Sequence, residues 1–228
     1  TRSMGGVGVG MRNAAAVNLL NPAAYSAVRP KSFLFDFGLE GQCFYNSQKY
    51  YGQTLNTSYY TVNFHDIAFQ LPIAKHLGLG FSLTPYSSVG YRMKQEVDDD
   101  EIWGNIGRVQ YQWDGDGDVT EVKLGLGWEI FRGFSIGIAA QYYWGDIQRI
   151  YKTAILENIT GGGLIADATG TETYSVSRFK GQFGVQWSPI SNRRRILTIG
   201  ATYDIGGDLN PNVTTKVQTG DIFNTVAM

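Results

Sequence analysis

The chain has 228 residues, among them 29 glycines and one cysteine, and only 17% of its residues are charged. The formal net charge of −1 excludes the basic surface that nucleic-acid-binding proteins normally carry. The single cysteine excludes an internal disulfide and any metal site built from several cysteines. No stretch is long and apolar enough for a transmembrane helix.

The chain opens on a glycine-rich stretch, SMGGVGVGMRNAAAVNLLNPAAYS, over residues 3–26. Four glycines lie close together here: Gly5, Gly6, Gly8 and Gly10. A dinucleotide-binding fingerprint does not fit, because Met11 stands where its third glycine belongs and no strand precedes it. A free N-terminal arm is the plainer alternative, although Leu19, Leu20 and Tyr25 are too apolar for a free tail.

From residue 32 onward, apolar residues recur at every second position in six separate segments. Between Val122 and Ile130, for example, the apolar residues alternate with lysine, glycine and glutamate. Period two predicts strands rather than helices. The expected strands cover residues 32–45, 57–71, 76–97, 117–131, 133–150, 172–189 and 195–206, and an eighth begins after Pro211.

The two faces of these expected strands favour a membrane barrel over a soluble sandwich. One face is aliphatic or aromatic, and the other carries mostly Gly, Ser, Thr, Gln and charged residues. Glycine weakens a strand that faces bulk water, but it suits the limited space inside a barrel. The segments also exceed the ~5–6 residues of an average soluble strand and reach the ~9–11 residues of a membrane-spanning one.

The connections agree with an outer-membrane barrel, in which short turns alternate with long loops. Short links are expected at residues 72–75, 131–133 and 188–192, and long stretches at residues 46–57, 96–118 and 148–173. Aromatic residues flank both kinds of connection, as interfacial girdles do. Residues 221–228 do not have the pattern of a closing strand. The expectation is therefore an all-β, antiparallel up-and-down transmembrane β-barrel of which this chain is the N-terminal part.

The glycine run Gly5–Gly10 and the sequence Asn21-Pro22-Ala23, placed just before the first strand, resemble the FadL-type outer-membrane transporters of long-chain fatty acids and aromatic hydrocarbons. The resemblance implies an N-terminal plug inside a 14-stranded barrel. Residues 1–30 would be the plug and residues 31–228 the barrel strands. It also implies that Gly5, Gly6, Gly8, Gly10, Asn21, Pro22 and Ala23 lie on the substrate path.

Passive transport of hydrophobic small molecules is the function that this resemblance implies. The alternative is a barrel like the PorV-type shuttle of type IX secretion, which binds and carries secreted proteins. A general polar porin is disfavoured by the plug-like N-terminus. The expected partners are membrane lipid, lipopolysaccharide, a hydrophobic substrate and an outer-membrane or secretion protein, with no nucleic acid.

A proline in the third expected strand suggests a lateral opening. Pro85 cannot donate to a strand ladder, so it implies a bulge, a kink or a gap in a strand that is paired on both sides. A harmless bulge is the plainer interpretation. FadL-type transporters have a kinked third strand that lets cargo leave sideways, and this implies an opening at Pro85, Ser87, Ser88 and Gly90.

Other chemistry is weakly represented. His65 and His76 lack partners at metal-ligand spacing, and no nucleophile motif occurs, so neither a catalytic site, a metal site nor a cofactor is expected. Asp114, Asp116 and Asp118 are expected at a solvated hairpin tip, with a cation site that bridges lipopolysaccharide as the alternative. The basic run at residues 193–195 is expected in a solvated turn near anionic headgroups.

Overall fold

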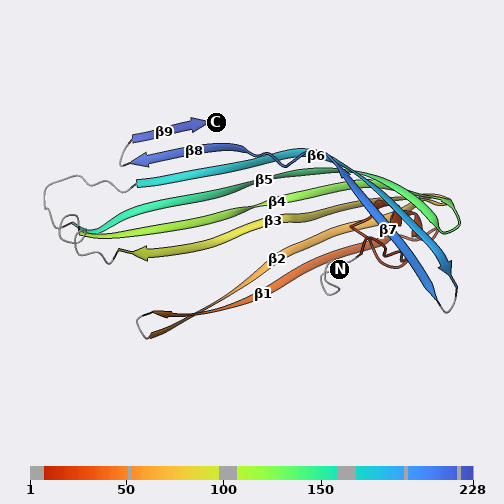
Figure 1. Cartoon of the computed structure of the whole chain (residues 1–228), viewed down its shortest axis with the longest axis horizontal. Coiled ribbons are helices and arrows are strands. Elements are labelled where there is room, and N and C mark those ends of the chain that lie inside the picture. The colour runs from red at the N-terminus through yellow and green to blue at the C-terminus, as the bar shows by residue number, and fades with distance from the viewer. Residues whose placement is uncertain are drawn as a thin grey trace. The chain divides into compact units, whose positions relative to one another are not determined.

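The computed structural model describes residues 8–50, 53–97, 107–158, 168–192, 195–219 and 222–227, and within them the chain is an antiparallel β-meander (Figure 1). The strands are β1 (Leu34–Tyr50), β2 (Gln53–Ala74), β3 (Leu77–Glu96), β4 (Gly107–Phe131), β5 (Phe134–Asn158), β6 (Ala168–Ser191), β7 (Ile196–Ile205), β8 (Asn212–Thr219) and β9 (Ile222–Ala227). A 3-10 helix, η2 (Pro22–Ala27), precedes them. The all-β, up-and-down part of the expectation is confirmed.

The sheet follows the order of the chain from β1 to β6, and β7 and β8 then pair with consecutive lengths of β6. β7 pairs with residues 181–191 of β6, and β8 pairs with residues 168–175. β7 and β8 thus lie along the same side of β6. The chain between them leaves the strand conformation after Ile205, where Gly206 has a φ of +128°. The described strands do not close into a barrel, because β1 and β9 end the path and β7 pairs with β6.

The alternation seen in the sequence corresponds to two different strand faces. On β4, Lys123 is 6% exposed and its neighbour Leu124 is 50% exposed; on β5, Ser135 is fully buried and Ile138 is 53% exposed. On these parts of β4 and β5 the apolar side chains therefore point outward and the polar and glycine positions point inward, which is the reverse of a water-soluble sheet. None of the helices in the described residues is long and apolar enough to cross a bilayer.

Most of the stretches expected as long loops are strand. β1 and β2 run on to a tight hairpin, with Tyr50 opposite Gln53, and β4 already begins at Gly107. Asp114, Asp116 and Asp118 consequently lie within β4 rather than at a hairpin tip, and that prediction is wrong. The C-terminal stretch also contains a strand, since β9 pairs with β8.

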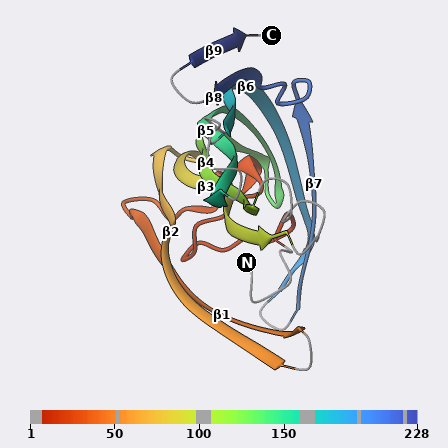
Figure 2. The same ribbon diagram turned by 90° about the vertical axis from the view of Figure 1, so that its left-hand side faces the viewer.

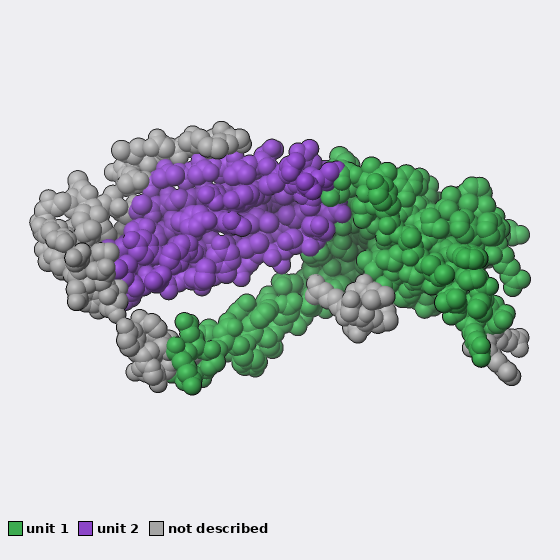
Figure 3. All heavy atoms as spheres, viewed as in Figure 1, with its two compact units in different colours: residues 1–85, 121–141, 179–206 green, residues 86–120, 142–178, 207–228 purple. Residues whose placement is uncertain are grey.

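The chain divides into two compact units, coloured in Figure 3. The first comprises residues 1–85, 121–141 and 179–206, and it contains the N-terminal segment together with β1, β2, β7 and parts of β3 to β6. The second comprises residues 86–120, 142–178 and 207–228, and its core is a cluster of Val119, Tyr143 and Val176. The ring of Tyr86 meets that of Tyr143 edge-on at 4.9 Å in this second unit.

Candidate functional site

The N-terminal segment, residues 8–33, packs against the inward face of the first unit (Figure 2). Its residues Ala23, Ala24 and Tyr25 are at most 3% exposed. Seven strand glycines, here called the glycine seat, leave the space that it occupies: Gly78, Gly80, Gly125, Gly127, Gly137, Gly184 and Gly200. A β-carbon at any of them would collide with the segment, which explains the glycines on the inward face.

Close approach is needed most where the backbone itself lies against a strand. At Gly137 a β-carbon would fall on the backbone of Pro22 and Ala23, and at Gly80 it would lie 2.6 Å from the ring of Tyr25. The glycine seat draws on β3, β4, β5, β6 and β7. One short segment can touch so many consecutive strands only if the sheet curves around it.

Two buried asparagines fold the segment on itself. Asn18 donates to the carbonyls of Gly8 at 3.0 Å and Met11 at 2.7 Å, and its own oxygen accepts from the backbone N–H of Leu20. Asn21 is fully buried; it caps η2 by accepting from the N–H of Ala23 at 3.0 Å. A buried amide side chain that is satisfied at both ends fixes a unique backbone path.

Polar side chains from the strands hold the main chain of the segment. Gln186 of β6 is fully buried and donates to the carbonyls of Val9 at 2.9 Å and Met11 at 3.1 Å. Lys123 of β4 donates to the carbonyl of Leu19 at 3.0 Å and pairs with Glu121 at 3.3 Å. Gln186 and Lys123 therefore bind carbonyl groups of the segment's main chain.

Tyr25 is the largest side chain that the segment buries, at 2% exposed. Its ring covers Gly80 and Gly125. Burial, followed by the nearby Glu121 carboxylate, raises the pKa of the Tyr25 hydroxyl. The phenol is consequently neutral at any physiological pH.

An ionic network joins the segment to two hairpin turns. Arg12 donates to the hydroxyl of Ser135 at 2.6 Å and lies 3.6 Å from the carboxylate of Glu129. Glu129 also accepts from the N–H of Gly133 at 3.0 Å and contacts the ring of His76 at 3.1 Å. Burial lowers the pKa of Arg12, and the charge of Glu129 partly offsets this. His76 lies in the turn between β2 and β3, where its φ is +68°.

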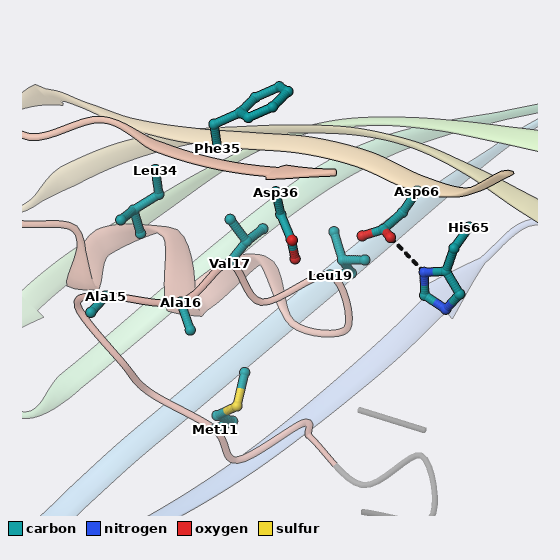
Figure 4. A pocket seen from close by; sticks show the side chains of 10 residues that line it. All are labelled: Met11, Ala15, Ala16, Val17, Leu19, Leu34, Phe35, Asp36, His65 and Asp66. Carbon is teal, nitrogen blue, oxygen red and sulfur yellow. Dashed lines mark hydrogen bonds and ion pairs between the residues drawn. The ribbon is translucent and has the colours of Figure 1, made fainter. Parts of the chain in front are cut away.

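A cavity of about 510 Å³ lies between the segment and the first two strands (Figure 4). It is lined by Met11, Ala15, Ala16, Val17, Leu19, Leu34, Phe35, Asp36, His65 and Asp66. Asp36 points into it, whereas Phe35 points away. The Nδ1 atom of His65 lies 2.5 Å from the Oδ1 atom of Asp66.

A β-bulge brings the histidine and the aspartate to the same side. Gly38 pairs with Asp66 and Leu39 pairs with Phe64, so His65 is an extra residue in β2. A β-carbon at Gly38 would lie 3.0 Å from the ring of His65, so glycine is needed opposite the bulge. The sequence pattern missed this pair, because alternation alone would put adjacent residues on opposite faces.

The structure brings most of the predicted plug residues together. Gly8, Gly10, Asn21, Pro22 and Ala23 all lie in the packed segment, whereas Gly5 and Gly6 fall outside the described residues. Sequence reasoning placed glycines on the inward face but did not find their contacts with the segment. It also missed the roles of Arg12 and Asn18 in the segment and of Lys123 and Gln186 on the strands. For the two strand residues, the available sign was a polar side chain at an inward position.

The predicted lateral opening lies on β3, just beyond the end of its hydrogen-bonded pairing with β2. The pairing of β2 with β3 runs from Ala74↔Leu77 to Ile67↔Leu83 and stops two residues before Pro85. Pro85, Ser87, Ser88 and Gly90 are all exposed on β3. An opening at these residues stays a prediction.

The remaining weak signals have ordinary partners. Asp114 accepts from Arg92 at 3.1 Å and from Gln112. Arg195 closes the turn between β6 and β7 through backbone hydrogen bonds with Asn192, and residues 193–194 and 98–101 fall outside the described residues. Within the described ranges, no three His, Cys, Asp or Glu side chains are grouped so that they could hold a metal ion.

Comparison with known protein families shows the family to which this chain belongs. The family model described as BamG matches residues 1–227. The chain belongs to the BamG family. No curated protein and no solved structure matches it.

This match corrects the FadL-type assignment and the functions drawn from it. Transport of fatty acids or aromatic hydrocarbons is wrong for this chain, and the PorV-type shuttle is unsupported. Asn21-Pro22-Ala23 and the described part of the glycine run, Gly8 and Gly10, belong to a compact segment that packs against a curved sheet. That packing requirement does not depend on what the protein carries or binds.

Proposed function

We propose that this chain acts in outer-membrane protein assembly as a non-catalytic, membrane-embedded partner of the Bam machinery. The family name BamG, matched over nearly the whole chain, supports the assembly role. The orientation of the strand faces supports the membrane setting. Together they favour a component that works through surfaces rather than through a reaction.

The observation that carries the membrane setting is the apolar outward face of the first unit. Its exposed side chains include Leu124, Leu126, Trp128, Ile138, Phe183, Trp187, Leu197 and Ile199. A soluble protein rarely exposes a continuous apolar surface of this kind, whereas a strand face against lipid requires one. The opposite face buries Lys123, Gln141 and Gln182. Turning this polar face toward lipid would cost free energy, because its polar groups would lose their partners.

We also propose that residues 1–30 plug a closed barrel to which residues 31–228 contribute strands. A sheet edge within the hydrocarbon layer leaves backbone N–H and C=O groups without partners, and closure removes the edge. The glycine seat supports a fixed plug, because its seven glycines leave room for both the backbone and the side chains of the segment. The count of fourteen strands came from the FadL-type resemblance and falls with it.

The strand orientation can be measured with spin labels on single cysteines in a Cys43→Ser background. Labels at Leu124, Ile138 and Ile199 should be relaxed by lipid-dissolved oxygen. Labels at Gln141 and Gln182 should be relaxed by a water-soluble nickel chelate, or be shielded from both agents. Equal responses from the two sets would contradict membrane embedding.

The assembly role is tested by depleting the protein in its own host. Folded outer-membrane β-barrel proteins, measured by their heat-modifiable mobility in gels, should decrease while their transcripts do not, and Bam subunits should co-purify with the tagged chain. Restoring the natural chain should restore the folded proteins. Normal folded levels after complete depletion would rule out a role in assembly.

A further inference from the structure

The short turns of the first unit carry a concentration of exposed cations. Because the sheet is an antiparallel meander, the β2–β3, β4–β5 and β6–β7 turns lie at one end of it, where β1 also begins. The cations of this end, here called the basic rim, come from the link before β1 and from these three turns: Arg29, Lys31, Lys75, Arg132 and Arg195. All five are exposed, and among the described residues none of them forms an ion pair with a carboxylate.

Acidic residues are nearly absent from the same connections. One carboxylate, that of Glu129, occurs in the four stretches of sequence that form this end: residues 27–33, 71–78, 128–136 and 188–197. Its side chain is 19% exposed, and it already contacts Arg12, His76 and the N–H of Gly133. The positive charge of the basic rim is therefore not balanced within these connections, and such a surface favours an anionic partner.

Exposed apolar side chains lie directly beside the basic rim. One stands next to or two residues from a cation in each connection, with exposed fractions of 60%, 52%, 59% and 74%: Phe33, Ile73, Phe131 and Ile196. The ring of Phe131 also stacks on that of Phe134 at 4.8 Å. In the membrane setting proposed above, apolar and aromatic side chains of this kind mark the edge of the hydrocarbon layer. The cations beside them consequently lie at the level of the lipid headgroups.

We propose that the basic rim binds the phosphate groups of anionic phospholipids in the periplasmic leaflet of the outer membrane. Short turns of outer-membrane barrels are on the periplasmic side, which assigns the leaflet. Arginine and lysine bind phosphate through charge-assisted hydrogen bonds, and each cation near an anionic surface adds to the attraction. This inference rests on the proposed membrane setting, and it names the lipid that the membrane-embedded component recognises.

A phospholipid fits this surface better than an acidic protein does. Its phosphate meets the cations while its acyl chains cover the apolar side chains next to them, so one molecule satisfies both surfaces. An acidic protein would have to cover Ile73, Phe131 and Ile196 as well as pair with the cations, although these apolar side chains are already suited to lipid.

The test measures the lipid selectivity of the purified natural chain in vesicles by tryptophan quenching. Trp128 and Trp187 are 52% and 50% exposed near the ends of β4 and β6 that lead to the turns, so brominated acyl chains beside the rim should quench them. The other three tryptophans, Trp103, Trp113 and Trp144, are replaced by phenylalanine. In mixtures with phosphatidylcholine, phosphatidylglycerol should bind about fivefold more tightly, the effect of one cation on one headgroup. High salt should weaken this preference, because it screens exposed charges.

A variant that combines Lys75→Gln, Arg132→Gln and Arg195→Gln should lose the preference for phosphatidylglycerol. These substitutions remove charge from exposed turn residues and leave Arg12 and Glu129 in place. The matched control removes three exposed cations that lie away from the turns, and it should keep the preference: Lys49→Gln, Lys94→Gln and Lys216→Gln. An unchanged preference in the rim variant would overturn the proposal.

Two further outcomes separate this proposal from the ones on which it depends. Equal binding of the two lipids by the natural chain would overturn the basic rim as a lipid site, while the assembly role is still tested by depletion. Quenching by neither brominated lipid would contradict the membrane setting, and the rim proposal would fall with it. Loss of co-purifying Bam subunits in the rim variant, with lipid selectivity unchanged, would assign the rim to an acidic protein instead.

Discussion

Replacing Gly137 with alanine should loosen the N-terminal segment and destabilise the first unit by about 3 kcal/mol, the upper end for overpacking. The new methyl group would fall on backbone atoms of Pro22 and Ala23 rather than on a flexible side chain. Backbone held by η2 and its Asn21 cap has little freedom to move aside. The free energy of unfolding, from denaturant titration in detergent micelles, measures the loss.

Gly41→Ala is the matched control, because Gly41 is also a strand glycine of the first unit but has nothing within 4 Å of its β-carbon position. Its stability should change by no more than about 0.5–1 kcal/mol, the intrinsic difference between glycine and alanine. Trypsin cleavage after Arg12 gives a second readout, since that side chain is 14% exposed in the packed segment. Equal stability and equal cleavage in the two variants would show that the glycine seat does not hold the segment.

Strand positions could be predicted where one face of a strand is apolar and points outward and the other face is polar or glycine and points inward. Between residues 122 and 144 the apolar and polar positions alternate, and the structure has β4 and β5 there. Strict alternation of apolar and polar residues is lost in residues 46–57 and 151–158, although both stretches contain paired strand. That is why the expected strand at residues 133–150 extends to Asn158, and why the stretch at residues 46–57 is a tight hairpin instead of a loop.

The candidate site was only partly predictable, because its geometry depends on exact register. The one-residue bulge at His65 moves that side chain to the inward face, and no local pattern announces it. Asn21 before Pro22 favours an extended or turn conformation from sequence alone. Their contacts with Gly184 and Val185, more than 160 residues away, follow from the curvature of the sheet and not from sequence spacing.

The family assignment failed for a related reason. Glycines, small residues and Asn-Pro-Ala describe a backbone that must pack closely, and many different proteins share that requirement. The inward residues Lys123 and Gln186 bind carbonyl groups of the segment. Such residues indicate a packed plug, but they do not indicate a substrate. The outward face indicated a membrane setting without distinguishing transport from assembly.

Replacing Asn21 with alanine should have the largest effect of any single substitution in the segment. The fully buried side-chain amide donates to the carbonyls of Val9 at 2.9 Å and Val185 at 3.1 Å, and its oxygen accepts from Ala23. Alanine removes all three bonds. The Val9 carbonyl keeps its hydrogen bond from Gln186, whereas the Val185 carbonyl and the Ala23 N–H lose theirs, at a cost of about 1–3 kcal/mol for each unsatisfied group. A total loss of about 4 kcal/mol is expected.

Asn21→Asp separates the two functions of this side chain. The carboxylate still accepts from Ala23, so the cap of η2 is kept, but it faces the two carbonyl oxygens without a proton to donate. It should therefore be nearly as unstable as the alanine variant at neutral pH. Asn13→Ala is the control, since Asn13 is exposed and accepts one local bond from the N–H of Ala15; its cost should stay below about 0.5 kcal/mol. An Asn21→Ala variant as stable as Asn13→Ala would mean that the segment is held by the strands alone, without the asparagine that joins Val9 to β6.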